Sequence, residues 1–134
     1  MLLVDTNVLL DVVEDDPRWG DWSKRRLEAQ SLRYRLIINA TIYAELSIGY
    51  QRIEELDQML ATASIAVVSI PRPALFLASK AFQRYRAQGG AKTGVLPDFF
   101  IGAHAAVANL PLLTRDTRRY RAYFPTVSLM TPEL

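Results

Sequence analysis

Two aspartates follow short apolar runs, at positions where the end of a buried strand would place a side chain in a binding site. Asp5 follows the run Leu2–Val4, and Asp116 lies two residues after the run Leu112–Thr114. Apolar runs of this length, bounded by polar residues, are typical of buried strands. In an open parallel sheet the ligand site lies at the carboxyl ends of the strands. We therefore expect both carboxylates at the same end of one sheet.

Two further acids are expected near that end. Asp98 opens a helix predicted at Pro97–Asn109, and Glu45 lies in the middle of a helix predicted at Thr41–Ile48. Four converging carboxylates repel one another, by about 1 kcal/mol per pair at 4 Å in water and about 4 kcal/mol at an effective dielectric constant of 20. Either protons or a hard divalent cation must neutralise them, and Mg²⁺ and Mn²⁺ prefer such oxygen ligands. A metal held in this way polarises a phosphoryl oxygen and activates water, which is the chemistry of phosphoryl transfer.

Each acid also has a structural interpretation. Asp5 and Asp98 each stand where an aspartate caps a helix. In this interpretation Glu45, which has apolar neighbours, pairs with an arginine. Asp116 forms ion pairs at the surface. The remaining acids of the first helices are expected to be solvated, namely Asp11, Asp15, Asp16 and Asp21.

The elements that must position these acids alternate between strand and helix. This alternation predicts an α/β fold with a parallel sheet of about five strands, covered by helices on both faces, in a single domain spanning residues 1–134. Strands are predicted at Leu2–Val4, Leu36–Asn39, Ile65–Ile70, Leu112–Thr114 and Thr126–Leu129. Helices are predicted at Asn7–Val13, capped by Thr6 or Asn7, and at Asp21–Ser31, Thr41–Ile48, Ile53–Ala63, Pro73–Gln88 and Pro97–Asn109.

Composition narrows the classes of function. The 134 residues are 50% hydrophobic and include no cysteine, which excludes a disulfide scaffold and a thiolate site. No apolar stretch reaches the ~20 residues of a membrane span, so we expect a soluble cytoplasmic protein. The net charge of +2 is distributed unevenly along the chain, because residues 67–134 carry nine basic and three acidic groups. A basic half favours a nucleic-acid or other acidic partner.

The single histidine, His104, lies six residues after Asp98 on the same predicted helix. That spacing points it away from the expected site, and we interpret it as a structural residue. A histidine-based metal site or hydrolase is therefore not expected.

Four motifs, in order along the whole chain, resemble those of PIN-domain nucleases. They are LVDTNVLL at 3–10, the helical Glu45, PDFFIGAHA at 97–105 and LLTRDTRRY at 112–120. The chain length is similar to that of VapC-type toxins of prokaryotic toxin–antitoxin modules. The resemblance implies a Rossmann-like α/β/α sandwich and Mg²⁺- or Mn²⁺-dependent cleavage of RNA. It assigns the acidic quartet to Asp5, Glu45, Asp98 and Asp116, supported by the polar residues Asn7 and Thr114.

The resemblance also implies partners, since VapC-like proteins form homodimers that an antitoxin protein inhibits. Trp19 and Trp22, in or beside a Pro/Gly loop, are candidate anchors for such an interface. Of the arginines that flank the last acid, we expect at least one to contact RNA phosphates, and the candidates are Arg115, Arg118 and Arg119.

Two alternatives remain open from the sequence. A haloacid-dehalogenase-like phosphohydrolase would use Asp5 as nucleophile, but it wants an acid where Asn7 stands and a lysine for which only Lys80 and Lys92 are candidates. The other alternative is a non-catalytic RNA-binding PIN domain, against which the intact set of acids argues.

Overall fold

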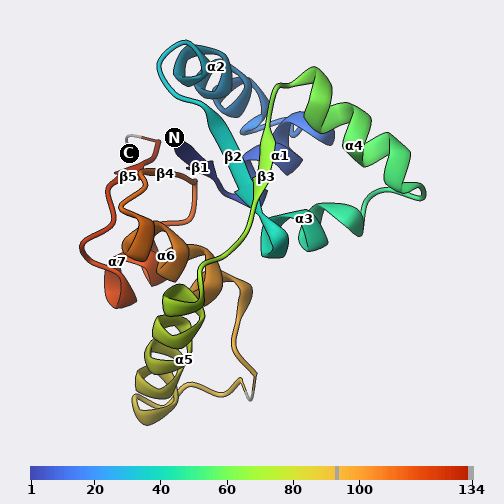
Figure 1. Ribbon diagram of the computed structural model, residues 1–134. Helices are drawn as coiled ribbons and strands as arrows, with labels where there is room; N and C mark the ends of the chain where they lie inside the picture. Colours follow the sequence, from blue (N-terminus) through green and yellow to red (C-terminus); the bar gives the residue numbers. More distant parts are fainter. Residues whose placement is uncertain (93, 133–134) are drawn as a thin grey trace.

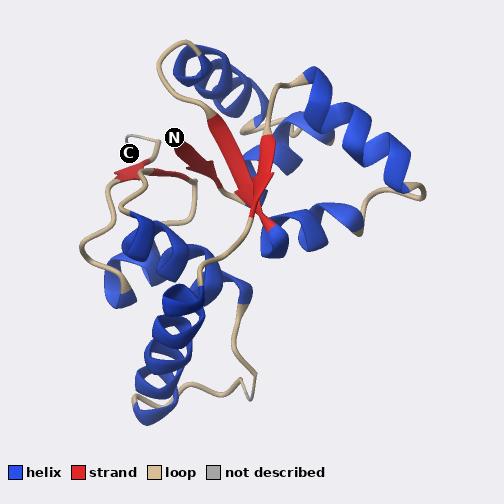
Figure 2. Ribbon diagram, viewed as in Figure 1, coloured by secondary structure: helices blue, strands red, loops and turns tan. Residues whose placement is uncertain are grey.

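The computed structural model, which describes residues 1–92 and 94–132, contains one five-stranded sheet with all strands parallel (Figures 1 and 2). The spatial order is β3-β2-β1-β4-β5. The central strands β1, β2 and β4 are buried throughout, as their continuous apolar runs predict. The predicted parallel sheet of five strands is therefore confirmed. The strands are β1 (Leu2–Val4), β2 (Leu36–Asn39), β3 (Ala66–Val68), β4 (Leu112–Leu113) and β5 (Leu129–Met130).

Seven helices of the described residues surround this sheet. In Figure 1 the first four gather around β2 and β3, while α5, α6 and α7 lie together on the other side of the view. α5 is the longest and extends away from the sheet beside α6. The helices are α1 (Thr6–Val13), α2 (Gly20–Ser31), α3 (Ala40–Ser47), α4 (Ile53–Thr62), α5 (Arg72–Ala87), α6 (Pro97–Ala108) and α7 (Arg118–Tyr123). None of the described helices is long and apolar enough to cross a membrane.

The strand order places a topological switch point between β1 and β4. The chain runs outward from β1 through β2 to β3, then returns to place β4 on the opposite side of β1. Val4 is in register with Leu113, and the Asp5 amide donates to the Leu113 carbonyl at 2.9 Å. The residues after β1 and β4 therefore start from adjacent points, which is where open α/β sheets bind ligands.

Helix α6 is buried because it is apolar almost all round. Phe99 is fully buried and makes edge-to-face contacts with Tyr123 and Phe124 at centroid distances of 5.3 and 6.3 Å. Gly102 lets α7 approach, since a Cβ at this position would lie 2.3 Å from the Phe124 ring. This packing fixes the first turn of α6, which carries Asp98.

The structure corrects several local predictions. Asp5, not Thr6 or Asn7, is the N-cap of α1, which agrees with its structural interpretation. The N-cap of α6 is Leu96, so the capping interpretation of Asp98 is wrong. The last strand is Leu129–Met130 rather than 126–129, because the Val127 amide donates to the Phe124 carbonyl and closes a turn there. Helix α7 was not predicted: its six residues include three arginines and give no apolar periodicity.

Candidate active site

Asp5 lies at the centre of the switch point, buried to 4% exposure and surrounded by uncharged donors. Its Oδ2 accepts hydrogen bonds from the hydroxyls of Thr114 and Tyr120, both at 2.8 Å, and from the Asn7 amide at 3.3 Å. These donors come from α1, the end of β4 and α7. The carboxylate is therefore held in one orientation by three elements, and no cation neutralises it within the described residues.

The three aspartates influence one another electrostatically. Burial raises the pKa of Asp5 to about 6, although its hydrogen bonds to Tyr120 and Thr114 oppose the shift, and the charge of Asp98 adds to it. Burial also raises the pKa of Asp98; Arg119 opposes this shift and the charge of Asp116 adds to it. The site is thus a place where negative charge is costly and a cation is favoured.

Asp98 and Asp116 line an open cavity of about 400 Å³ beside Asp5. Arg119 Nη1 donates to Asp98 Oδ2 at 3.2 Å, and both side chains are about one-third exposed. Asp116 is exposed, and its amide donates to the Thr114 hydroxyl at 3.1 Å. The surface ion pair predicted as an alternative for Asp116 is not among the contacts of the described residues.

Glu45, on α3, does not line this cavity but lines a second one, together with Val95 and Phe100. The Thr6 hydroxyl donates to the Oε1 of Glu45 at 2.6 Å. Because Thr6 follows Asp5 in the chain, this bond links Glu45 to the residue next to Asp5. Within the part of the chain that the structure describes, Glu45 makes no ion pair with an arginine, so the alternative of a buried salt bridge is wrong.

The donor chemistry of this region fits a hard divalent cation. All the acids supply carboxylate oxygens, and burial together with a neighbouring aspartate raises the pKa values of two of them, Asp5 and Asp98. The side chains do not, however, form a closed cage: across residues 1–92 and 94–132 no group of three His, Cys, Asp or Glu side chains is arranged to hold an ion. A cation would therefore draw these carboxylates together rather than enter a preformed shell.

Arg115 and Asp11 form a buried ion pair that the sequence did not indicate. Asp11 is only 3% exposed, so the expectation that it is solvated is wrong. Its two oxygens accept from Arg115 Nε and Nη at 2.6 and 2.8 Å, Ser23 adds a hydroxyl at 2.6 Å, and Trp19 lies 5.2 Å from the guanidinium. Arg115 therefore has an acidic partner within the protein, and its expected RNA contact stays a prediction. Arg118 and Arg119, in contrast, line the cavity.

Two residues that contact the acids were not predicted as part of the site. Tyr120 is fully buried and bonds Asp5, and Thr6 bonds Glu45. A sequence signal for Tyr120 exists, since it is the only apolar residue within the arginine-rich stretch 115–121 and must point inward. The structural interpretation of His104 is confirmed: it is buried, contacts the Asn39 amide at 3.1 Å, and has its pKa lowered by burial.

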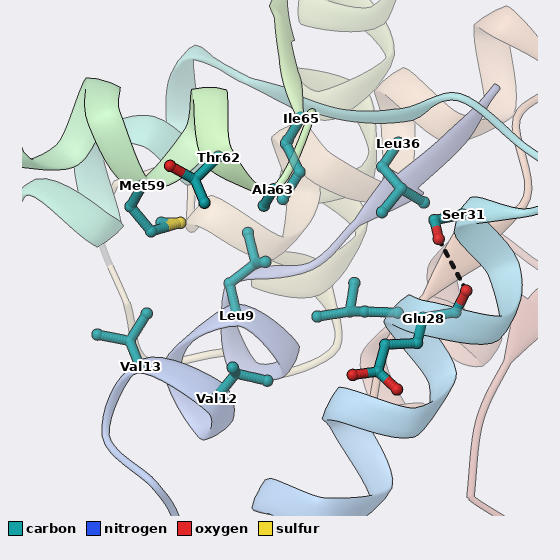
Figure 3. Close-up of a pocket in the computed structure, with 11 residues that line it drawn as sticks. Leu9, Val12, Val13, Glu28, Ser31, Leu36, Met59, Thr62, Ala63 and Ile65 are labelled. Carbon is teal, nitrogen blue, oxygen red and sulfur yellow. Dashed lines mark hydrogen bonds between the residues drawn. The ribbon is translucent and has the colours of Figure 1, made fainter.

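A separate apolar groove of about 420 Å³ lies between α1, α2 and α4 (Figure 3). Leu9, Val12 and Val13 of α1 face Met59 and Thr62 of α4 across it. Val12 and Val13 are 36% and 44% exposed. The tryptophans lie near the start of α2, half-buried and packed edge-to-face at 6.2 Å.

Asp11→Asn should lower the free energy of unfolding by about 2–3 kcal/mol, because a buried Arg115 charge would lose its carboxylate. Urea denaturation measures this loss. The control is Glu54→Gln, which removes the exposed Arg52–Glu54 pair at 3.6 Å and should cost at most about 0.5 kcal/mol. Equal effects of the two substitutions would contradict a structural role for the buried pair.

The raised pKa of Asp5 predicts how metal-free stability depends on pH. Folded protein binds the Asp5 proton more tightly than unfolded protein, so stability should fall by about 2–3 kcal/mol as pH rises from about 4 through 6 and stay low above that. In Asp5→Asn this fall should shrink to the part contributed by Asp98. Thermal unfolding across this range in a chelator tests it; an unchanged fall in the variant would exclude Asp5 as its source.

Comparisons with known proteins agree on one family. A family model described as PIN domain matches residues 2–125. A search of curated proteins gives no match.

Among solved structures, VapBC2 from Rickettsia felis, bound to a DNA fragment from its promoter, aligns with a TM-score of 0.75 and 19% identity over 98% of both chains. A toxin–antitoxin complex from Klebsiella pneumoniae aligns with a TM-score of 0.70 and 26% identity over 99% of this chain and 98% of that one. FitAcB from Neisseria gonorrhoeae aligns with a TM-score of 0.68 and 21% identity, covering 97% of this chain and 96% of that one. With its predicted sheet confirmed and nearly its whole length matched, the chain belongs to the PIN-domain family.

Proposed function

We propose that this PIN domain is a divalent-metal-dependent endoribonuclease and the toxin of a VapBC-type toxin–antitoxin module. The observation that supports it most directly is the set of mutually interacting carboxylates, Asp5, Asp98 and Asp116, at the switch point of a PIN fold. Burial raises the pKa values of Asp5 and Asp98, and these acids lie at or beside an open cavity that two arginines also line. Such a region suits a cation and a phosphate together.

Asp5, Asp98 and Asp116 would hold Mg²⁺ or Mn²⁺, with Glu45 alongside. When bound, the metal would polarise the phosphoryl oxygen and lower the pKa of water. Residues of the protein itself would accept the proton and bind the RNA. Glu45, held by Thr6, is placed to accept a proton from the attacking water, and Arg118 and Arg119 offer positive charge to the RNA backbone.

Asp5 keeps its orientation in this proposal through residues that never touch the substrate. Thr114, Tyr120 and Asn7 all donate to its Oδ2, so its Oδ1 retains only the Thr6 amide at 2.7 Å. The amide of Asn7 also donates to the Thr114 hydroxyl at 3.2 Å. Asn7 thus acts in positioning, where the phosphohydrolase alternative would need an acid.

The proposed protein partner is an antitoxin. Two of the similar structures are described as VapBC2 and as a toxin–antitoxin complex. The apolar groove between α1, α2 and α4 is large enough for one face of a partner helix, whose apolar side chains would cover Val12 and Val13. A cytoplasmic homodimer is part of the same proposal, and exposed Leu75 and Phe76 on α5 provide apolar surface outside the groove.

Purified protein should cleave single-stranded RNA with Mg²⁺ or Mn²⁺ and not with EDTA. Asp98→Asn should reduce cleavage to background, and Glu45→Gln should reduce it by about 10²–10⁴-fold, because each removes charge from the site. Asp57→Asn, an exposed acid on α4, is the matched control and should retain activity. If RNA binds but wild-type protein never cleaves it, the non-catalytic alternative is favoured.

Val13→Glu should weaken antitoxin binding by at least about tenfold, because a partner helix would bury the new charge in an apolar groove. Cleavage by the free variant should equal that of wild type. Val107→Glu, at a valine of similar exposure on α6, should change neither quantity. Titration of cleavage with purified antitoxin measures both, and full neutralisation of Val13→Glu would place the antitoxin elsewhere.

A further inference from the structure

The cavity beside the acids has an aromatic wall as well as a charged one. Besides Asp98 and Asp116, the half-buried rings of Tyr85 on α5 and Tyr123 on α7 line it. Arg118 and Arg119 also line the cavity. Its volume of about 400 Å³ is within the range of pockets that hold small organic groups. Catalysis by carboxylates does not by itself explain this wall.

The two rings are fixed in place by the surrounding structure. Tyr85 and Tyr123 meet each other at a centroid distance of 6.4 Å, and each packs edge-to-face on Phe99. The Tyr123 hydroxyl donates to Gln88 Oε1 at 2.7 Å. The backbone of Gly90 supports Tyr85 so closely that a Cβ there would lie 2.3 Å from the ring. Rings held in this way would lose little freedom when a ligand binds.

Flat, cationic groups already lie against both rings. The guanidinium of Arg119 is 5.5 Å from the centre of Tyr85, and that of Arg84 is 5.4 Å from the centre of Tyr123. Each ring therefore already packs against one planar cation, and a base would replace that guanidinium or stack on it. Nucleobases stack on tyrosine rings and on arginine planes alike, whereas a bare phosphate uses only the arginines.

We propose that this cavity is a nucleotide subsite, in which an unpaired base packs against Tyr85 and Tyr123 and its phosphate binds Arg118 and Arg119. The inference rests on the proposed ribonuclease function and adds to it the residues that would receive a base. A base can reach the rings only when it is unstacked from its neighbours, so the preferred substrate is single-stranded RNA or the loop of a folded one.

The test is a binding cycle in EDTA, where metal-dependent cleavage does not occur. One probe is a fluorescent RNA of about eight adenosines, and the other is the same ribose-phosphate chain without bases. Tyr123→Leu should weaken binding of the adenosine probe by about tenfold, because stacking contributes about that much per base. Binding of the abasic probe should not change. Tyr85→Leu should act likewise, whereas Tyr50→Leu, which removes a half-buried tyrosine from a different cavity, should affect neither probe.

The two probes separate stacking from general damage. If a tyrosine variant loses affinity equally for both probes, the ring is only structural and the subsite is wrong. If wild-type protein binds both probes equally, no base is recognised and the subsite is again wrong, while phosphate binding and the ribonuclease proposal stand. If wild-type protein binds neither probe, the proposed function fails together with the subsite.

Discussion

The burial of the Asp5 carboxylate is the constraint on which the other features of this PIN domain depend. A carboxylate at 4% exposure needs compensation, and here it comes from neutral hydroxyl and amide donors rather than from a cation. Because Thr114 follows β4 and Tyr120 lies on α7, the donors can reach Asp5 only if β4 lies beside β1 and α7 folds back over the strand ends. One buried charge thereby links the sheet order to the placement of the last helix.

Two arginines of the last motif form ion pairs with acids of other helices. One lies in the loop after β4 and the other lies on α7. Arg115 binds Asp11 of α1, and Arg119 binds Asp98 of α6. The first pair is the more buried and fixes the loop to the domain, whereas the second lies at the open cavity. These two arginines, four positions apart in the same arginine-rich stretch, therefore have different roles, because α1 offers a buried acid and the cavity a half-buried one.

Most of the fold could be predicted from the sequence, because it depends on local apolar runs and on the alternation of strand and helix. The four acids were also found locally, as residues that follow strands or start helices. Two partners of Asp5, Asn7 and Thr114, were identified through the family resemblance. Other contacts were not, since those of Tyr120 with Asp5 and Arg115 with Asp11 join residues more than 100 positions apart. Helix α7 was missed because its six residues, three of them arginines, give no apolar periodicity.

Helix α1 belongs to both the acidic site and the apolar groove, although the two are separate cavities. Asp5, its N-cap, and Asn7 in its first turn contribute to the site, while Val12 and Val13 at its other end line the groove. An eight-residue helix spans only about 12 Å. Asp11, between these ends, also holds Arg115 and thus the loop that carries Asp116. A partner seated in the groove, as proposed, would therefore contact the helix that orients Asp5 and holds the loop of Asp116, and it would not need to reach the acids directly.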